Sequence, residues 1–286
     1  MHIPVMTDAA LEYLAIRPEG TYLDVTLGLG GHTGAIAARL TTGIVIGQDR
    51  DLESIEIAKR NTAEYSGRIR YCHGRFSQLS STLPAQGIAQ VDGLLADLGV
   101  SRLQLTEAER GFSLMADGPL DMRMDRSTGE PAADLVNFSA EEALANLIYQ
   151  LGEERRSRKI ARAIVRARPL RSTGHLASVI EAVVPRTGKL HPATRTFMAL
   201  RLAVNSEQEE LDALLAEAPK LVRPGGRIVI ISFMSLEDRK VKQSFQALAR
   251  EGRAQILTKH VVTPAEGEVQ HNPASRSAKL RALEMK

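Results

Sequence analysis

A dense cluster of glycines after a short apolar run most constrains what this chain can fold into. Residues 22–27 are typical of a strand, and Gly28, Gly30, Gly31 and Gly34 follow before a segment with helical character. Glycine adopts backbone conformations that other residues avoid and leaves space where a Cβ would stand. A helix that begins after such a loop presents unpaired N–H groups. The pattern predicts a loop that lets a nucleotide cofactor approach closely.

Asp49 narrows the expected cofactor to one that carries a ribose. It follows a second apolar run, residues 44–46, and stands about 20 residues beyond the glycine loop. An acid at this spacing is typical of a group that hydrogen-bonds ribose hydroxyls.

Two further residues argue against a dinucleotide. The dinucleotide fingerprint needs a third glycine where this chain has Thr33. Asp24, just before the glycines, would repel a pyrophosphate but attract a sulfonium and an amino group. S-adenosylmethionine carries both of these cations and no phosphate. Alternatively, Asp24 only tethers the loop through hydrogen bonds to backbone N–H groups.

The size, charge and cysteine content of the chain indicate which broad class of protein it belongs to. With 286 residues, 43% of them hydrophobic, the chain can form one or two domains. The formal net charge is only +3, although the pI is near 9.1, so the placement of the basic residues matters more than their sum. The single cysteine, Cys72, excludes a disulfide framework and is expected to be a buried, inert thiol. No apolar run approaches about 18 residues and no signal peptide is recognisable, so we expect a cytoplasmic protein without a membrane partner.

The distribution of apolar runs predicts an α/β fold with an insertion. Short runs, separated by longer amphipathic stretches, occupy residues 22–26, 44–46, 69–72, 91–98 and 228–231. This alternation predicts a parallel sheet. Helices are expected at 211–221 and 235–250, with a turn at 223–226. Because residues 106–206 lack strand patterns and are rich in helix formers, we expect one discontinuous domain, 1–105 and 207–286, interrupted by a helical insertion.

The expected insertion carries a strongly basic run. Between positions 153 and 171 only Glu153 and Glu154 are acidic, against the basic residues Arg155, Arg156, Arg158, Lys159, Arg162, Arg166, Arg168 and Arg171. Such a run is often only the solvated face of a helix, or pairs with nearby acids. Beside a nucleotide-cofactor domain, it favours contact with a polyanion, and nucleic acid is the candidate partner.

Ten sequence blocks together carry a family resemblance. They are residues 2–5, 30–33, 49–51, 97–101, 109–113, 118–124, 152–154, 191–197, 232–239 and 272–273. The chain resembles the MraW/RsmH family of small-subunit ribosomal RNA methyltransferases nearly end to end, and the block that contains residues 119–124 is very specific. The resemblance implies a Rossmann-like class I methyltransferase sheet with an inserted all-helical subdomain. It also implies transfer of a methyl group from S-adenosylmethionine to the exocyclic N4 of one cytidine in the decoding region of 16S ribosomal RNA.

The resemblance also implies which residues hold the cofactor. It places Gly30, Gly31 and His32 around the methionine part, Asp49 on the ribose and Phe76 beside the adenine. Two alternatives stay open, because Phe76 could be an ordinary core anchor and His32 could cap a helix or satisfy a core hydrogen bond. No metal is expected, since no second His or Cys stands at ligand spacing from His32.

Asp97 and Gln104 are implied at the cofactor and reaction centre, with Asp97 as the catalytic residue. Asp97 ends the fourth expected strand, where ligands bind in open α/β sheets. Its carboxylate could accept an N–H bond from the cytosine amine, steady the sulfonium, or act only as a cofactor ligand. The target base is expected to flip out of the RNA into the pocket.

The substrate is expected to be 16S ribosomal RNA within the small subunit, with no DNA bound. Its expected contacts are Arg155, Arg156, Arg158 and Lys159. The chain departs from the family at Arg102-Leu103, where a small pair is usual, and at Met234, where His is usual. A nicotinamide dehydrogenase and a non-catalytic ribosome-assembly factor are the competing functions.

Overall fold

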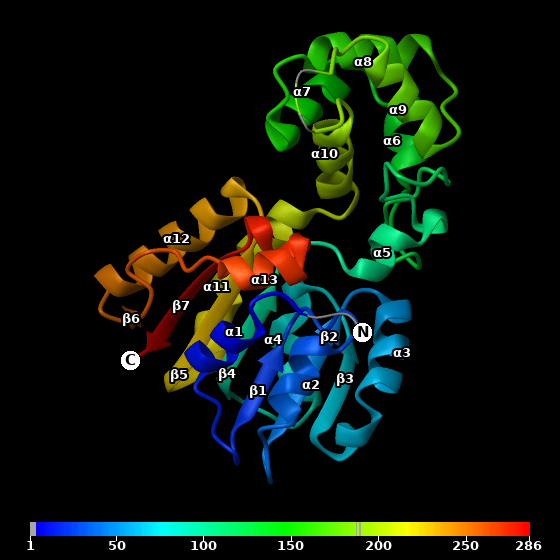
Figure 1. The fold of residues 1–286 in the computed structure, drawn as a ribbon. Coiled ribbons are helices and arrows are strands. Elements are labelled where there is room, and N and C mark those ends of the chain that lie inside the picture. The colour runs from blue at the N-terminus through cyan, green and yellow to red at the C-terminus, as the bar shows by residue number, and fades with distance from the viewer. Residues whose placement is uncertain (1–3, 187, 189) are drawn as a thin grey trace. The chain divides into compact units, whose positions relative to one another are not determined.

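The computed structural model describes residues 4–186, 188 and 190–286, so His2 and Ile3 of the first family block lie outside the described residues. The chain forms two compact units (Figure 1). One ends at Gly99 and resumes from Gln208 to Lys286, and the other is Val100–Glu207. The sequence pattern put the corresponding boundaries at 105/106 and 206/207.

The first unit is built on a mixed seven-stranded sheet, as the α/β prediction requires. Its order is β3 (Ile69–His73), β2 (Ile44–Asp49), β1 (Thr21–Asp24), β4 (Val91–Asp97), β5 (Val222–Ser232), β7 (Lys279–Met285) and β6 (Ala254–Ile256). The first five strands run parallel, whereas β7 is antiparallel to both β5 and β6. Because the chain moves outward from β1 to β3 and then returns to β4, the strand order reverses between β1 and β4. Ligands bind at this switch point in open α/β sheets.

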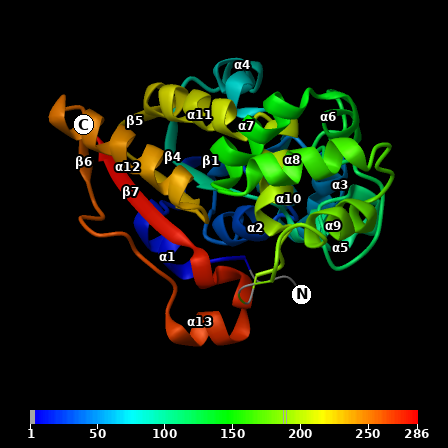
Figure 2. The ribbon, with the colours of Figure 1, turned by 90° about the horizontal axis from the view of Figure 1, so that it is seen from above.

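Helices cover both faces of the sheet. They are α1 (Thr7–Leu14), α2 (Gly31–Ala37), α3 (Leu52–Asn61), α4 (Leu79–Ala85), α11 (Glu207–Leu221) and α12 (Ser235–Arg250), whereas α13 (Glu266–His271) has no buried residue. Ile228 and Ile230 of β5 join a core with α4, α11 and α12, whereas Val229 and Ile231 join a core with α1 and α2. Figure 2 shows α4 and α11 on one side of the sheet and α1 and α2 on the other. This alternation follows from the two-residue period of a strand.

Two features of the sheet differ from the sequence expectation. The turn predicted at residues 223–226 lies inside β5, where Val222 pairs with Val91 but Arg227 already pairs with Gly93. The extra residues form a bulge-like irregularity, which lets the strand continue past Pro224. Strands β6 and β7 were not predicted. Cys72, on β3, is only partly buried against the core, and burial raises the pKa of its thiol.

The second unit is helical in its described residues and has its own core. Its helices are α5 (Arg102–Thr106), α6 (Ala132–Phe138), α7 (Glu141–Gly152), α8 (Ser157–Arg166), α9 (Thr173–Glu181) and α10 (Thr194–Val204). Buried side chains from five of these helices, including Val136, Ile148, Ile160, Leu176 and Phe197, pack together. None of the helices in the described part of the chain is both long and apolar enough to cross a membrane.

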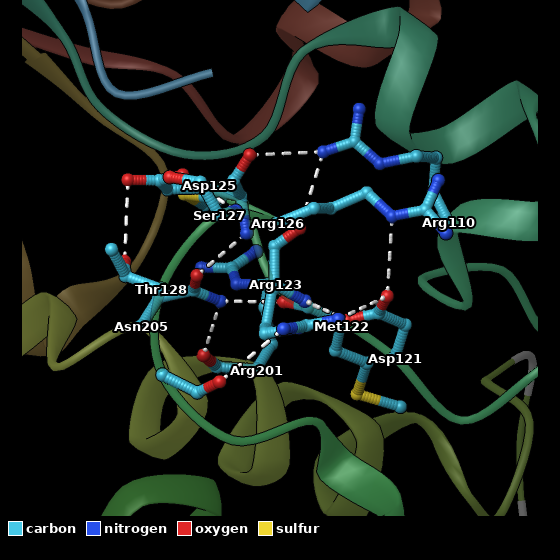
Figure 3. Close-up of polar contacts among 12 residues, drawn as sticks. Arg110, Asp121, Met122, Arg123, Asp125, Arg126, Ser127, Thr128, Arg201 and Asn205 are labelled. Atoms are coloured by element: carbon cyan, nitrogen blue, oxygen red, sulfur yellow. Dashed lines mark hydrogen bonds and ion pairs between the residues drawn. The ribbon is translucent and has the colours of Figure 1, made fainter. Parts of the chain in front are cut away.

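The family block 118–124 forms a loop that buried polar groups hold in place (Figure 3). Met122 has a left-handed backbone, with φ of 60°, and its side chain is buried. Asn205, at the end of α10, accepts a hydrogen bond from the Met124 N–H (2.8 Å) and donates one to the Met122 carbonyl (2.7 Å). Arg110 donates to the carbonyls of Arg123 and Met124, at 3.1 and 3.0 Å. These contacts stabilise a backbone that a non-glycine residue rarely adopts.

We therefore expect Asn205→Ala to lower the free energy of unfolding by about 2–4 kcal/mol, because it leaves a buried N–H and a buried carbonyl without their partner. Urea titration measures the change. Asn61→Ala is the matched control, because the Asn61 side chain is exposed and donates one bond, to the Leu29 carbonyl (2.9 Å). Similar losses for the two variants would contradict a special role for Asn205.

Candidate active site

Three aspartates stand at the carboxyl ends of neighbouring strands. Asp49 ends β2, Asp24 ends β1 and Asp97 ends β4. Because β2, β1 and β4 are adjacent and parallel, the three carboxylates belong to one edge of the sheet at its switch point. The sheet therefore concentrates negative charge where an α/β fold binds its ligand.

Asp24 tethers the glycine loop. Its side chain is fully buried and accepts hydrogen bonds from Thr33 Oγ1 (2.7 Å) and from the Thr26 N–H (3.0 Å). The tethering alternative therefore describes its contacts, and a direct approach to a ligand does not fit a side chain without exposed surface. Its charge still acts nearby, because it contributes to raising the pKa of both Asp49 and Asp97.

Two of the glycines, Gly28 and Gly30, adopt the left-handed backbone that the sequence suggested, and neighbouring protein atoms fill the space beside others. At Gly30, with φ of 88°, a Cβ would lie 2.9 Å from Thr62 Cγ2, and at Gly31 it would overlap the Pro4 ring. The Cβ positions of these two glycines are therefore occupied by the protein itself. Gly28, with φ of 51°, has no such neighbour, and the nearest atom to its Cβ position is the Thr26 carbonyl oxygen, 3.8 Å away.

Asp49 closes the glycine loop against the end of β2. Its Oδ2 accepts from the Gly28 N–H (2.7 Å) and its Oδ1 from the Asp51 N–H (2.9 Å). Burial raises the pKa of Asp49 to about 6, although the two backbone donors oppose this change. Each carboxylate oxygen has a second acceptor site. The half-buried carboxylate can therefore still accept bonds from ribose hydroxyls.

Asp97 has one oxygen that no group in the described protein satisfies. Its N–H donates to Thr26 Oγ1 (2.6 Å), and its Oδ2 lies 3.7 Å from His32 Nδ1. Its Oδ1 is buried and accepts no hydrogen bond from any described residue. Burial raises the pKa of Asp97 to about 6, whereas the nearby His32 lowers it. A buried acceptor without a donor fits a ligand that brings an amine or ammonium group.

His32 lies between the N-terminal segment and Asp97. Its ring is almost fully buried, and its Nε2 lies 3.0 Å from the Val5 carbonyl oxygen. The alternative of a core hydrogen bond therefore describes this nitrogen. The described residues contain no cluster of three His, Cys, Asp or Glu side chains arranged for a metal ion.

Phe76 and Gln104 have local packing roles. Phe76 begins a 3-10 helix (Phe76–Gln78) after β3 and is partly buried against the core, as in the core-anchor alternative. Gln104 belongs to the second unit, where its Oε1 accepts from the Ser101 N–H (3.0 Å) and its own N–H donates to Ser101 Oγ (3.3 Å). These reciprocal bonds cap α5. The structure therefore brings the glycine loop, His32, Asp49 and Asp97 together at the carboxyl ends of the strands in the first unit.

Sequence reasoning missed two residues that shape this edge. Thr26 connects Asp24 to the Asp97 N–H. Glu237, almost fully buried at the start of α12, accepts from the N–H groups of Phe233 and Met234 and contributes to raising the pKa of Asp97. The sequence held a signal for Glu237, because a glutamate at the third position of an expected helix typically bonds the backbone N–H groups at the start of that helix.

The basic run forms an amphipathic helix in the second unit. Ile160, Ala161 and Ile164 of α8 are buried, whereas its basic residues and the two that precede it are exposed. Those exposed residues are Arg155, Arg156, Arg158, Lys159, Arg162 and Arg166. Among the described residues, the ion pair of this helix joins Arg162 to Glu141 (3.4 Å), and no carboxylate pairs with the four predicted RNA contacts.

The comparisons with known proteins agree with this architecture. The profile of the MraW methylase family matches residues 1–286. A relative named ribosomal RNA small subunit methyltransferase H, from Solibacter usitatus, is 64% identical over the full length of both chains. A protein of the same name from Acidobacterium capsulatum is 49% identical and covers 100% of this chain and 98% of its own.

A solved structure provides an independent comparison of the fold. A protein from Clostridium thermocellum, provisionally named an rRNA methylase, aligns over the full length of both chains with a TM-score of 0.52 and 11% identity. This likeness supports the Rossmann-like class I fold alone. The family profile and the two relatives show more: this chain belongs to the MraW methylase family and is a methyltransferase.

Proposed function

We propose that this methyltransferase transfers a methyl group from S-adenosylmethionine to the exocyclic N4 of a cytidine in the decoding region of 16S ribosomal RNA. The relatives' names support small-subunit ribosomal RNA as the substrate. The observation that carries the proposal is the buried, unpartnered Oδ1 of Asp97 at the switch point of the sheet. The cytidine N4 and the decoding region rest on the family resemblance.

The first unit has the groups that this cofactor needs. S-adenosylmethionine supplies an electrophilic methyl group on a positively charged sulfur. Asp49 accepts bonds from the ribose hydroxyls, and Phe76 offers the exposed part of its ring to the adenine. Gly31 and His32 open α2, where backbone N–H groups lack acceptors within the helix, and Gly30 shapes the turn before them. Gln104 remains part of the proposed site through the family resemblance.

Asp97 is the proposed catalytic residue. The lone pair of the cytosine amine is delocalised into the ring, so the enzyme must hold the amine in line with the methyl carbon, and positioning of this kind lowers barriers by several kcal/mol. The free Oδ1 can accept an N–H bond from the amine and so fix its orientation. A base reaches such a buried group after it has flipped out of its RNA stack.

The second unit supplies the proposed RNA contacts. Arg155, Arg156, Arg158 and Lys159 are exposed and have no carboxylate partner in the described chain. Four unneutralised cations at one end of a helix match the phosphate backbone of RNA within the small subunit.

The function is tested by mapping methylated nucleosides, by mass spectrometry, in 16S ribosomal RNA from cells with and without this protein. We expect one N4-methylated cytidine in the decoding region to be lost without the protein and restored by the wild-type gene. The Asp97→Ala gene should fail to restore it although its protein accumulates. An unchanged methylation pattern would exclude the proposed substrate.

For the cofactor site we expect Asp49→Ala to weaken S-adenosylmethionine binding about ten-fold or more, because one charge-assisted hydrogen bond contributes about 1.5–3 kcal/mol. Titration calorimetry of the purified protein measures this change. Exposed Asp8, changed to Ala, is the matched control, and NAD is the control ligand. Equal affinities of wild type and Asp49→Ala would remove Asp49 from the ribose site.

For the RNA contacts we expect a variant with Gln at positions 155, 156, 158 and 159 to bind the small subunit more weakly. The slope of log affinity against log salt should flatten by about 0.7–0.9 per lost phosphate contact. The matched control removes four exposed charges from the first unit by changing Lys59, Arg60, Lys242 and Arg250 to Gln. If both variants change the slope equally, α8 acts only through net charge.

A further inference from the structure

The hydrogen bond to Val5 determines which nitrogen of His32 carries a proton. A backbone carbonyl only accepts, so His32 Nε2, 3.0 Å from the Val5 oxygen, must be the donor. A neutral imidazole protonated at Nε2 has its lone pair on Nδ1. This lone pair lies on the nitrogen that is nearest to Asp97.

Two bare acceptors would then face each other in a buried site. His32 Nδ1 lies 3.7 Å from Asp97 Oδ2, which is longer than a hydrogen bond but within the range of an ion pair. The His32 side chain is 4% exposed and that of Asp97 22%, so water screens this contact poorly. A proton on His32 Nδ1 turns the repulsion into a charge-assisted attraction, because the imidazolium and the carboxylate then have opposite charges.

We propose that His32 is a positioning residue for Asp97: its ring, with a proton on Nδ1 as well as on Nε2, forms an ion pair with Oδ2 and leaves Oδ1 as the acceptor for the substrate amine. The proposal rests on the proposed function for the identity of that amine. It assigns the His32 side chain to the catalytic carboxylate, whereas the family resemblance implied the methionine part of the cofactor.

The negative charges around Asp97 explain why a positively charged neighbour matters for its ionisation. Asp24 on β1 and Glu237 on α12 are both buried and negative, and together with burial they raise the pKa of Asp97, to about 6. His32 on α2 is the neighbour that opposes them. Asp24 and Glu237 already accept bonds from Thr33 and from the Phe233 N–H, respectively. His32 thus favours the ionised form of Asp97.

An ionised Oδ1 can complete the reaction. The amine lone pair forms the new N–C bond while the C–S bond breaks, and both electrons of that bond go to the sulfur. The nitrogen then carries one proton too many. It passes this proton to Asp97 Oδ1, which yields a neutral secondary amine and a carboxylic acid. The proton on His32 Nδ1 stays in place, so Oδ1 alone changes its state.

The test follows the Asp97 carboxyl by carbon-13 NMR during a pH titration of the cofactor-free protein. We expect a midpoint of about 6 in the wild type. In His32→Gln it should rise by about one pH unit or more, because an opposite charge within about 4–6 Å is lost. His271→Gln is the matched control, since an exposed His271 also bonds a backbone carbonyl, that of Gly267 (2.7 Å). It should leave the Asp97 midpoint unchanged.

The pH dependence of activity is a second measurement, and it should shift in the same direction as the NMR midpoint. Methyl transfer needs ionised Asp97, so kcat should fall as the pH drops through the Asp97 midpoint, and it should fall at higher pH in His32→Gln. The KM for S-adenosylmethionine should stay within about two-fold at pH values above both midpoints, because the variant retains Asp49 and the backbone N–H of residue 32, which is the group that the proposed cofactor site uses at this position.

Two results would overturn the proposal. One is an Asp97 midpoint that does not move in a folded His32→Gln protein. If that variant does not fold, nitrogen-15 NMR of the wild-type imidazoles decides, and a His32 ring with bare Nδ1 beside an ionised Asp97 contradicts the pairing. Loss of the proposed RNA activity is a separate outcome, because the NMR titration contains neither cofactor nor RNA.

Discussion

The buried carboxylate of Asp24 organises the functional edge of the sheet, because a charge hidden from water must be surrounded by hydrogen-bond donors. Thr33, at the start of α2, and Thr26, in the loop after β1, supply these donors. Thr26 also accepts the Asp97 N–H, so one carboxylate connects the end of β1, the helix after the glycine loop and the end of β4. The glycine loop itself is closed from the other side by Asp49. Removal of the central acceptor would leave several donors unsatisfied at once.

This arrangement concentrates negative charge at a place where burial already disfavours it. The pKa of Asp49 and that of Asp97 are both raised to about 6, primarily by burial, and the charge of Asp24 adds to each. Such a cluster lowers the stability of the free protein near neutral pH, since a carboxyl with a raised pKa contributes most below its unfolded pKa and least above its folded one. A ligand that carries positive charge relieves the repulsion. The repulsion among these carboxylates, which lowers the free energy of unfolding, therefore also favours a sulfonium cofactor over a phosphate-bearing one.

Much of the fold could be predicted because strands and helices each have a characteristic spacing of apolar residues along the sequence. The parallel strands, the amphipathic α8 and the separate helical unit all follow from the spacing of apolar residues. The bulge in β5 was read as a turn, because Pro224 and Gly225 are typical of turns and only pairing with β4 shows that the strand continues. The sequence predicted the left-handed backbone at Gly28 and Gly30, but not which residues pack beside the glycines. Pro4 and Thr62, which fill the space beside them, lie far away along the chain.

The sequence by itself determined the class of fold, the position of the glycine loop, the acids at the strand ends and the basic helix, because each depends on residues close together in the chain. Tertiary structure decided what those residues do. Asp24 became a buried tether, and His32 was brought between Val5 and Asp97. Gln104 was bonded to Ser101 within the second unit. Hydrogen bonds and buried charges depend on distances of a few ångströms between segments that are remote in sequence, and local periodicity carries no information about those distances.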